Sequence, residues 1–396
     1  MTITTLKPET AAQVTDAVRW ALSAGEPLEI LGSGSRRGLG RPVQAGHALD
    51  LSGLSGVIAY EPEELVLTAL SGTPMDMIRA MLADRGQHLA FEPPEGGTLG
   101  GLVASGLAGP RRISAGSARD HTLGIAGVSG RGEAYKGGGK VVKNVTGYDV
   151  PKLMAGSFGT LTALTEITVK VLPAPEDSAT LLLSGLDDQA AVAMLDRALR
   201  SPYEVSGAAH LPAGIAARSG VSAVSGAGGA VTLVRLEGFG PSVAARVAML
   251  REELRADAVL GRDLSLAVWR EVRDGDCLGA GNDAHLWKLS VPPSAGPATV
   301  EAIRRTLDVE AFYDWGGGLV WLALRSDSAP PDSAAAIRGA LSAGGHAMLV
   351  RAPESVRAAT DVFQPLPEAL MALSRRVKES FDPKGILNPG RMYAGL

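Results

Sequence analysis

The fold is decided by residues 137–173, which read GGGKVVKNVTGYDVPKLMAGSFGTLTALTEITVKVLP. Three glycines in this stretch, Gly147, Gly156 and Gly159, permit tight turns and let main-chain N–H groups come close to a ligand. Apolar and polar residues then alternate over residues 161–172, as is typical of a half-buried strand. A glycine loop leading into such a strand predicts a large, phosphate-bearing ligand along this backbone.

Length and composition describe a soluble globular protein with many turns. The chain has 396 residues, of which 45% are hydrophobic, 20% are charged and 4% are aromatic, and it contains 50 glycines. This length exceeds the usual size of one compact core, so we expect two domains. The formal net charge of −4 provides no basic surface for nucleic acid, and we expect no nucleic-acid partner.

Cys277 is the only cysteine, which excludes an internal disulfide framework and a cysteine-rich iron–sulfur or zinc site within this chain. The first 25 residues lack a basic segment followed by an apolar core, so we expect no secretory signal. No apolar run reaches the ~20 residues that a membrane-spanning helix needs. We therefore expect a cytoplasmic protein that meets the inner face of the cell membrane only through a partner.

Hydrophobic periodicity predicts an α+β chain rather than regular βαβ winding. Thr10 is placed to cap a helix that Gly25 ends. Pro173 and Pro175 mark a domain boundary, and the alternation beyond it indicates an antiparallel sheet covered by helices. The expected strands are residues 28–31, 48–51, 65–70, 123–128, 161–172, 180–183, 231–237, 284–291, 318–324 and 347–351, and the other expected helices are residues 74–83, 102–107, 189–199, 243–256, 334–342 and 370–379.

The loop at residues 32–40, GSGSRRGLG, is suited to binding an anion. Its alternating glycines can turn successive N–H groups toward a diphosphate, and Arg36 and Arg37 can add positive charge. The spacing does not match the GxGxxG motif of nicotinamide-binding folds, and Pro42 stands where such a fold needs a helix. From the residues alone, an ordinary glycine turn is the alternative. The predicted binding residues are Gly32, Ser33, Gly34, Ser35 and Arg36.

Two segments carry a resemblance to a known family. Residues 143–161, KNVTGYDVPKLMAGSFGTL, and residues 381–393, FDPKGILNPGRMY, resemble the PCMH-type flavin-binding domain of the vanillyl-alcohol oxidase superfamily, and most closely the E-subunit family of bacterial glycolate oxidases. The resemblance covers the two ends of the chain well and the middle poorly. It implies a two-subdomain FAD-binding domain at residues 1–175, a substrate or cap domain of antiparallel sheet and helices at residues 176–365, and a C-terminal segment at residues 366–396 that returns to the FAD domain.

The same resemblance assigns two more glycine clusters to FAD. A TLGG-type turn at residues 98–101 begins a small-residue helix, whose first N–H groups and small side chains would face the flavin. Tight helix packing is the alternative explanation of these small residues. Phe158 stands where relatives often carry Glu, so it is left out of the site. The residues implied are Gly97, Thr98, Gly100, Gly101 and Ser105 in the second cluster, and Gly156, Ser157, Gly159, Thr160, Leu161 and Ile167 on the adenine and diphosphate side.

Covalent flavin attachment in this superfamily uses a histidine or cysteine near the first loop or in the cap domain. The first loop contains neither residue type, and His47 lies beyond Pro42. Cys277 lies in the region that matches poorly. We therefore predict that FAD is bound noncovalently.

Few residues are candidates for catalysis. Because flavin accepts the hydride, the protein has to bind a carboxylate and remove a hydroxyl proton, for which Arg and His are suitable residues. Related dehydrogenases carry a histidine-rich HxGDGNxH-like motif, and residues 281–285, GNDAH, echo it without the first histidine. His285 alone does not make a metal site, and we predict none. His346, followed by Arg351, is the better catalytic candidate, and a packed loop histidine is the alternative.

Three functions remain open from the sequence. The first is an FAD-binding subunit of glycolate oxidase, which would take part in oxidising glycolate to glyoxylate beside a homologous FAD-containing D-type subunit and an iron–sulfur F-type subunit. The second is a self-sufficient flavin dehydrogenase of another small 2-hydroxy acid. The third is a non-catalytic subunit that holds flavin for assembly. The missing histidine motif favours the first and third functions over the second.

Overall fold

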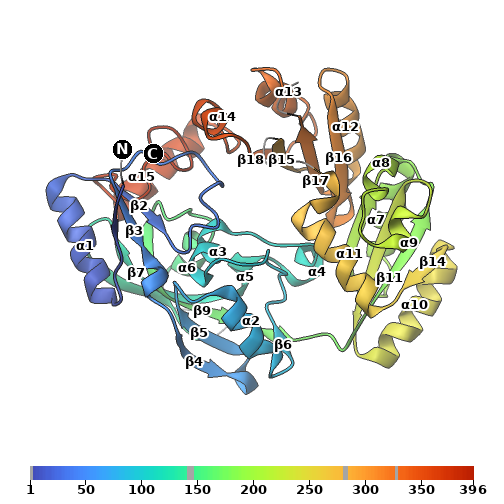
Figure 1. Cartoon of the computed structure of the whole chain (residues 1–396), viewed down its shortest axis with the longest axis horizontal. Coiled ribbons are helices and arrows are strands. Elements are labelled where there is room, and N and C mark those ends of the chain that lie inside the picture. Colours follow the sequence, from blue (N-terminus) through green and yellow to red (C-terminus); the bar gives the residue numbers. More distant parts are fainter. Residues whose placement is uncertain (1–2, 141–146, 280–283, 326–328) are drawn as a thin grey trace. The chain divides into compact units, whose positions relative to one another are not determined.

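The computed structural model describes residues 3–140, 147–279, 284–325 and 329–396. The chain divides into two compact units, each a mixture of helices and strands (Figure 1). Unit 1 contains Met1–Ala108, Gly116–Pro173 and Arg357–Leu396, and unit 2 contains Gly109–Ala115 and Ala174–Val356. The predicted α+β fold class is confirmed.

Unit 1 contains a small parallel sheet with one helix. Thr10 caps this helix by accepting a hydrogen bond from the N–H of Gln13, and Gly25 ends it with a φ of 70°. Val14 and Val18 of the helix are buried in the core of this sheet. The strands run in the order β1-β3-β2, and the elements are β1 (Thr4–Leu6), α1 (Ala11–Ala24), β2 (Leu28–Leu31) and β3 (His47–Asp50).

A five-stranded antiparallel sheet forms the larger part of unit 1. Its central strand comes from the alternating segment at residues 161–172, as predicted, and its buried side chains include Ile167 and Val169. The order is β4-β5-β9-β7-β8, with β4 (Val57–Glu61), β5 (Val66–Leu70), β7 (Thr122–Ser129), β8 (Ala134–Gly138) and β9 (Thr162–Lys170). A separate short pair joins β6 (Gln87–His88) to β10 (Leu172–Pro173).

The helices of unit 1 pack against this sheet (Figure 1). The small-residue helix begins three residues earlier than predicted, because the hydroxyl of Thr98 accepts a hydrogen bond from the N–H of Gly101 and so caps it. Ile78 and Leu102 belong to the buried core. The helices are α2 (Met75–Ala83), α3 (Leu99–Ser105), α5 (Ala118–His121), α6 (Val150–Met154) and α15 (Glu368–Phe381), and α14 (Glu354–Ala359) continues from unit 2 into unit 1.

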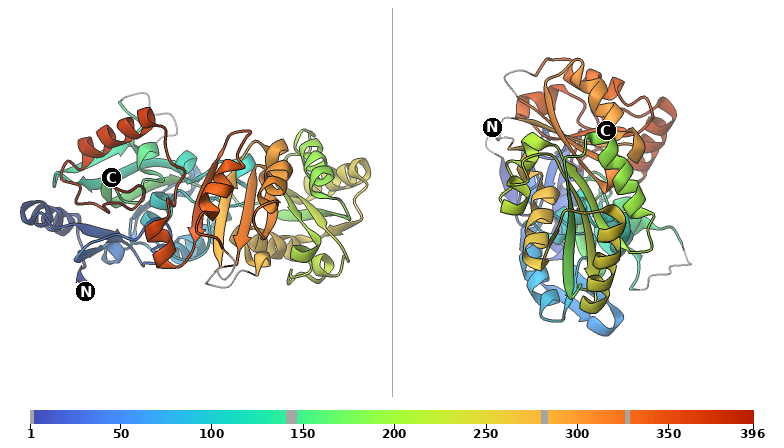
Figure 2. Two further views of the ribbon diagram at one scale, coloured as in Figure 1. Left: turned by 90° about the horizontal axis from the view of Figure 1, so that it is seen from above. Right: turned by 90° about the vertical axis from the view of Figure 1, so that its right-hand side faces the viewer.

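Unit 2 is an eight-stranded antiparallel sheet with helices on both faces (Figure 2). Leu182 packs on one face with Trp269, and its neighbour Leu181 packs on the other face with Leu195 and Leu250. The order is β14-β11-β13-β12-β16-β17-β15-β18, with β11 (Asp177–Ser184), β12 (Val205–Leu211), β13 (Val231–Gly238), β14 (Ala258–Leu260), β15 (His285–Ser290), β16 (Val309–Asp314), β17 (Leu319–Leu324) and β18 (His346–Arg351).

Several elements of unit 2 were not predicted from the sequence. β12 and β16 were not predicted because nearly all of their residues are buried, on both faces of the sheet, so neither strand shows the regular apolar and polar alternation of a surface strand; Glu310 of β16 is the exposed exception. The helices are α4 (Arg112–Ala115), α7 (Asp188–Leu199), α8 (Ala213–Ala216), α9 (Ser222–Ser225), α10 (Gly240–Leu254), α11 (Arg262–Asp274), α12 (Gly296–Arg304) and α13 (Ser333–Gly339), of which α4, α8, α9, α11 and α12 were not predicted.

A buried charge cluster joins the segment Gly109–Ala115 to the sheet of unit 2. Arg111 donates from Nε and Nη2 to the two carboxylate oxygens of Glu237, at 2.9 and 2.7 Å. Arg235 Nε lies 3.2 Å from the same carboxylate, and the Arg235 guanidinium lies 4.6 Å from the centre of the Trp269 ring. Burial alone would raise the pKa of Glu237, but the two arginines together with a hydrogen bond from the Ser206 hydroxyl lower it to about 2.

We predict that Glu237 makes stability depend on pH between about 4.5 and 2. Because its pKa falls on folding, the carboxylate stabilises the folded protein above pH 4.5, and this contribution is lost as the pH falls toward 2. Glu237→Gln should destabilise the protein at pH 6 by about 3 kcal/mol or more. The difference from wild type should shrink at pH 3, measured by urea denaturation.

Glu310→Gln is the matched control, since Glu310 pairs with Arg218 at a position where half of its side chain is exposed. Its effect should stay below about 1 kcal/mol at both pH values. An unchanged difference between Glu237→Gln and wild type at pH 6 and pH 3 would contradict the prediction.

Candidate functional site

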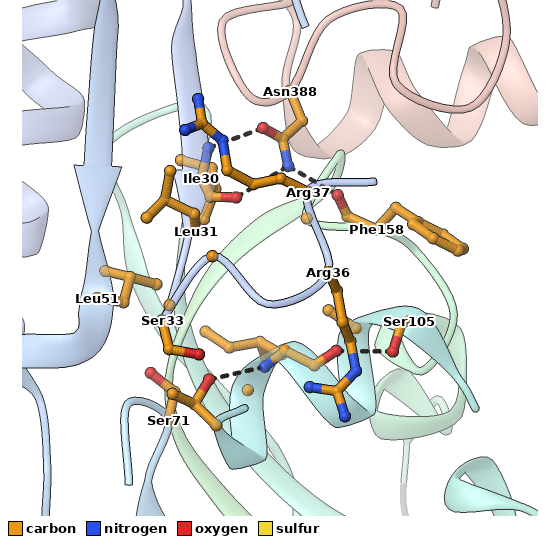
Figure 3. Close-up of a pocket in the computed structure, with 18 of the residues that line it drawn as sticks. Ile30, Leu31, Ser33, Arg36, Arg37, Leu51, Ser71, Ser105, Phe158 and Asn388 are labelled. Atoms are coloured by element: carbon orange, nitrogen blue, oxygen red, sulfur yellow. Dashed lines mark hydrogen bonds between the residues drawn. The ribbon is translucent and has the colours of Figure 1, made fainter. Parts of the chain in front are cut away.

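A cavity lies in unit 1, and the space within it is about 760 Å³ when the open solvent at its mouth is included. Its walls come from β2 and the loop after it, from α3, from the start of β9 and from the C-terminal segment (Figure 3). Of the residues predicted from the sequence, those that line it are Gly32, Ser33, Gly34, Ser35, Arg36, Thr98, Gly100, Gly101, Ser105 and Gly159, whereas Gly97, Gly156, Ser157, Thr160, Leu161 and Ile167 lie behind its walls or beside them.

The first glycine loop presents free main-chain donors to this cavity. Within the described part of the chain, the N–H groups of Ser33, Gly34, Ser35 and Arg36 donate no hydrogen bond to protein. Gly34 has a φ of 76°, a conformation that glycine adopts without strain. Successive N–H groups of this kind form an anion-binding concavity.

The two arginines of this loop differ in their contacts. Arg37 is engaged, since its Nε donates to Glu29 at 2.8 Å and its Nη2 contacts the other oxygen of that carboxylate. Arg36 donates only weakly, to Gly96 O at 3.3 Å and to Ser35 Oγ at 3.4 Å, and it pairs with no carboxylate among the described residues. Burial, and secondarily the charge of Arg79, lowers the pKa of Arg36. Its guanidinium points toward α3, and its charge is available to an anionic ligand (Figure 3).

The second glycine cluster forms a close-packed wall rather than a set of donors. The N–H groups of Leu99 and Gly100 already donate to Thr73 O and Ser71 O, at 3.0 and 2.7 Å, and that of Gly101 donates to Thr98 Oγ1. The expectation that these first N–H groups of the helix face the ligand is therefore wrong. The small size of these glycines instead allows close packing, because a Cβ on Gly100 would lie 2.9 Å from Ser71.

Gly97 and Gly32 similarly make room for neighbouring side chains. A Cβ on Gly97 would lie 1.9 Å from the Nη1 atom of Arg36, so a side chain there would displace that guanidinium from its present place. A Cβ on Gly32 would lie 2.4 Å from the hydroxyl of Thr98. These glycines bring the first loop and the start of α3 together.

The third glycine cluster is attached to α3. Gly156 N donates to Val103 O at 3.0 Å, and Phe158 N donates to Ala104 O at 2.8 Å. Phe158, which was left out of the predicted site, lines the cavity beside Gly159. This loop therefore continues the wall that α3 begins.

The C-terminal segment supplies two cavity residues that sequence reasoning did not identify. Asn388 Oδ1 accepts from the N–H of Ile30 at 2.7 Å, and Asn388 Nδ2 donates to Phe158 O at 2.7 Å (Figure 3). Arg391 Nη2 donates to the carbonyl oxygens of Arg36 and Arg37, at 3.0 and 3.1 Å. Burial lowers the pKa of Arg391 to about 10, which leaves it charged at neutral pH. The turn Asn-Pro-Gly was visible in the sequence, but its contacts were not.

A buried lysine holds this segment in place. Lys378 Nζ donates to Thr160 O at 2.7 Å, to Leu387 O at 2.8 Å and to the carboxylate of Asp382 at 2.6 Å. Asp382 also accepts from the N–H groups of Ile386 and Leu387. The third glycine cluster and the C-terminal turn thus share one buried ammonium group.

Arg37, which the sequence of the first loop offered as positive charge for a diphosphate, also lines the cavity. The other cavity-lining residues that the sequence did not indicate are Glu29, Ile30, Leu31, Leu51, Ser71, Ala104, Thr162 and Leu164. Most of them are apolar or small, and no local motif marks them. They come from separate strands and loops of unit 1, so only the folded chain brings them together.

The catalytic candidates His346 and Arg351 lie in unit 2, on β18. In the register of the sheet, Ser290 of β15 pairs with His346, and Leu286 of β15 pairs with Arg351. Lys288 is two residues from each of Leu286 and Ser290, so it lies on the same face as both. A register shift between Leu286 and Trp287 places Arg351 opposite Leu286, on this face as well, although Arg351 is five residues from His346. The Nζ atom of Lys288 lies 4.1 Å from the centre of the Trp321 ring. Basic side chains thus gather on one face of the sheet, and the carboxylates of Asp314 and Asp274 are near enough to Lys288 to act on its pKa.

Two pKa shifts mark this basic face. Burial lowers the pKa of Lys288 to about 8, so the side chain remains a cation at pH 7. Burial also lowers the pKa of His346, and the nearby charge of Arg112 lowers it further. His346 is therefore neutral at pH 7 and able to accept a proton.

His285 lies on the opposite face of β15 from Lys288, since the two are three residues apart along the strand. Its side chain is buried, and burial lowers its pKa. Residues 281–283 of the GNDAH segment lie outside the described residues. Among the described residues, no group of three or more His, Cys, Asp or Glu side chains is placed to hold a metal ion.

Comparison with known proteins identifies the family. Residues 4–138 match the family described as FAD binding domain, and residues 363–392 match the family described as FAD linked oxidases, C-terminal domain. Glycolate oxidase subunit GlcE of Escherichia coli strain K12 is 37% identical over 96% of this chain and 97% of that protein. The chain belongs to the GlcE family. The predicted family and the prediction of FAD as cofactor are both confirmed.

One further relative and one solved structure are also similar to this chain. Glycolate oxidase subunit GlcD of Bacillus subtilis strain 168 is 34% identical over 39% of this chain and 34% of that protein. The solved structure of p-cresol methylhydroxylase with substrate bound has a TM-score of 0.74 and 16% identity, and it covers 98% of this chain and 88% of that chain. This second likeness concerns the fold alone. None of the helices in the described part of the chain is long and apolar enough to cross a membrane.

The cavity fits the FAD that the family requires. It combines an anion-binding loop, a charge on Arg36 that no carboxylate neutralises, and a wall of small residues on α3. A buried hydroxyl, that of Ser71, lines the cavity and has no hydrogen-bond partner among the described residues. These are the features expected of a site for a large ligand that carries a diphosphate.

We predict that Gly34→Val and Gly159→Val each empty the FAD site. Valine strains the left-handed backbone at both positions, and a Cβ at Gly159 would lie 2.7 Å from Asn388 Nδ2. The purified variants should lose most of their flavin absorbance per polypeptide. Gly228→Val is the control, because Gly228 has a φ of 73° and open space around it in unit 2. Full flavin content in both cavity variants would contradict the assignment.

We predict that Asn388→Ala weakens FAD binding at least tenfold, since it removes the hydrogen bonds that join β2 to the third glycine cluster. The change should also lower the thermal midpoint, because Asn388 has a φ of 43° that alanine tolerates poorly. Gln13→Ala removes an exposed amide that accepts one hydrogen bond, and it should change neither measurement. Wild-type FAD affinity in Asn388→Ala would show that the hydrogen bonds of Asn388 are not needed for FAD binding.

Proposed function

We propose that the chain is the FAD-binding E-type subunit of glycolate oxidase and takes part in the oxidation of glycolate to glyoxylate. The observation that carries this proposal is the similarity to the GlcE subunit of Escherichia coli over nearly the whole of both chains. The cavity of unit 1 supports it, because its free N–H donors and unpaired arginine suit the diphosphate of FAD.

In this proposal, residues 1–175 and 366–396 hold FAD noncovalently, and residues 176–365 handle the substrate. When bound, FAD supplies the group that accepts a hydride from the substrate carbon. The N–H groups of residues 33–36 and the Arg36 guanidinium would hold the diphosphate, and the small residues of α3 would allow the flavin close to the wall. Among the residues that the structure describes, the cavity lining contains neither His nor Cys, which supports noncovalent binding.

The basic face of unit 2 provides the groups that a 2-hydroxy acid requires. Lys288 is a partly buried cation beside Trp321, and together with Arg351 it is suited to binding a carboxylate. His346 is neutral at pH 7 and can take the proton of the hydroxyl group as a general base. Arg351 and His346 are therefore our catalytic candidates, and Lys288 joins them from the structure.

The proposed partners are a homologous FAD-containing D-type subunit and an iron–sulfur F-type subunit. A relative named glycolate oxidase subunit GlcD supports the existence of a complex of several subunits. The lone Cys277 gives this chain no cluster of its own to pass electrons onward. We propose a cytoplasmic location, with the membrane reached at its inner face through the complex.

A second candidate function is independent oxidation of a 2-hydroxy acid by this chain. The basic face of unit 2 favours it, because Lys288, His346 and Arg351 could bind and deprotonate such a substrate without a partner. The third function, a non-catalytic subunit that holds flavin, predicts no effect of these side chains on the reaction.

We predict that the purified chain alone reduces its flavin slowly with glycolate, whereas co-expression with the D-type and F-type subunits gives robust activity with an artificial electron acceptor. The electrons need a route that this chain does not contain. Anaerobic loss of flavin absorbance after glycolate addition measures the first property, and dye reduction measures the second.

The variants His346→Ala and Lys288→Gln separate the candidate functions. Rapid bleaching of the isolated chain that both variants abolish would support independent catalysis and contradict the prediction. Activity of the complex that is unchanged in both variants would support the non-catalytic role. Phe239→Ala serves as a control, since Phe239 is an exposed side chain of unit 2 outside this face.

A further inference from the structure

We propose that the hydroxyl of Ser71 forms a hydrogen bond to an oxygen atom of bound FAD. The inference rests on the FAD site of the proposed function and adds a contact that neither motif nor family resemblance indicated. Ser71 follows β5, its side chain is 2% exposed, and it lines the cavity. Its Oγ atom has no hydrogen-bond partner among the described residues.

The backbone fixes Ser71 in this position. Ser71 N donates to Thr165 O at 3.0 Å, and Ser71 O accepts from Gly100 N at 2.7 Å. The first of these bonds attaches the residue to β9, and the second attaches it to the start of α3. The side chain is therefore held at the junction of two cavity walls, close to Ser33 of the anion-binding loop (Figure 3).

A buried hydroxyl without a partner is unfavourable, and folded proteins retain few of them. The hydroxyl of Ser71 lies unpaired at the surface of the cavity, where it could both donate and accept a hydrogen bond. FAD has phosphate, ribityl and ring carbonyl oxygens, each of which can accept a hydrogen bond from the Ser71 hydroxyl. A hydrogen bond to the cofactor thus explains why a serine occupies this buried position.

Two other serines make the inference specific. Ser105 also lines the cavity, but its hydroxyl already donates to Gly101 O at 2.8 Å and lies 3.1 Å from Leu102 O. Ser157 is buried and its hydroxyl has no partner among the described residues, but it does not line the cavity. Only Ser71 of these three combines an unpaired hydroxyl with a place in the cavity wall.

The test is a titration of FAD into the full-length apoprotein, followed by the quenching of flavin fluorescence. Ser71→Ala should weaken FAD binding about tenfold, the usual effect of losing one hydrogen bond. Ser71→Cys, which keeps the size and a weaker donor, should fall between wild type and Ser71→Ala. Ser157→Ala, which changes a buried hydroxyl outside the cavity lining, should bind FAD as wild type does.

The thermal midpoint of the apoprotein provides a second measurement. Ser71→Ala should not lower it, because the hydroxyl makes no hydrogen bond that the folded apoprotein would lose. A lower midpoint in Ser71→Ala would mean that this hydroxyl has a structural partner, and it would overturn the inference. Equal weakening of FAD binding by Ser157→Ala would also overturn it, since the effect would not depend on the cavity.

Failure of this inference is distinguishable from failure of the proposed function. Wild-type affinity in Ser71→Ala, with FAD bound normally by the wild-type protein, overturns the Ser71 contact and leaves the FAD site intact. A wild-type apoprotein that does not take up FAD overturns the site itself and the inference with it.

Discussion

The buried ammonium group of Lys378 is the constraint on which the cofactor wall depends. It is an expensive group to bury, and it is tolerated because a carboxylate and two carbonyl oxygens surround it. Those partners belong to the third glycine cluster and the C-terminal turn. Satisfying one charge therefore positions the turn that carries Asn388, and Asn388 in turn joins β2 to Phe158. These polar contacts of Lys378 and Asn388 together fix the shape of this part of the cavity.

Four arginines near the cavity illustrate the difference between structural and available charges. Arg37 is neutralised by Glu29, Arg391 is used by backbone carbonyl groups, and Arg79 donates to the carbonyl oxygens of Pro93 and Pro94. Arg36 has only weak contacts with neutral oxygens. The first three hold the loops that surround the site, and the fourth leaves positive charge where an anionic ligand would need it. Two adjacent arginines in the sequence thus have different tasks.

Much of the fold could be predicted from local sequence, because alternation and capping residues act over short distances. β9 followed from residues 161–172, and α1 followed from Thr10 and Gly25. β12 and β16 could not be found in this way, since strands that are buried on both faces, as these are apart from Glu310, show no regular alternation. The glycines of the loop at residues 32–36 predicted its conformational freedom. The first N–H groups of α3 donate to the carbonyl oxygens of Thr73 and Ser71 instead of facing a ligand, and no local sequence pattern reveals these partners.

The contact between Ile30 and Asn388 joins residues that are 358 positions apart in the chain. The sheet of unit 2, by contrast, is closed entirely by strands within residues 177–351. Contacts between distant residues form slowly, because the intervening chain loses conformational freedom before the contact stabilises anything. Prior folding of unit 2 would shorten the effective loop between the two halves of unit 1. This topology favours formation of the sheet of unit 2 before the contact between Ile30 and Asn388 closes the cofactor cavity.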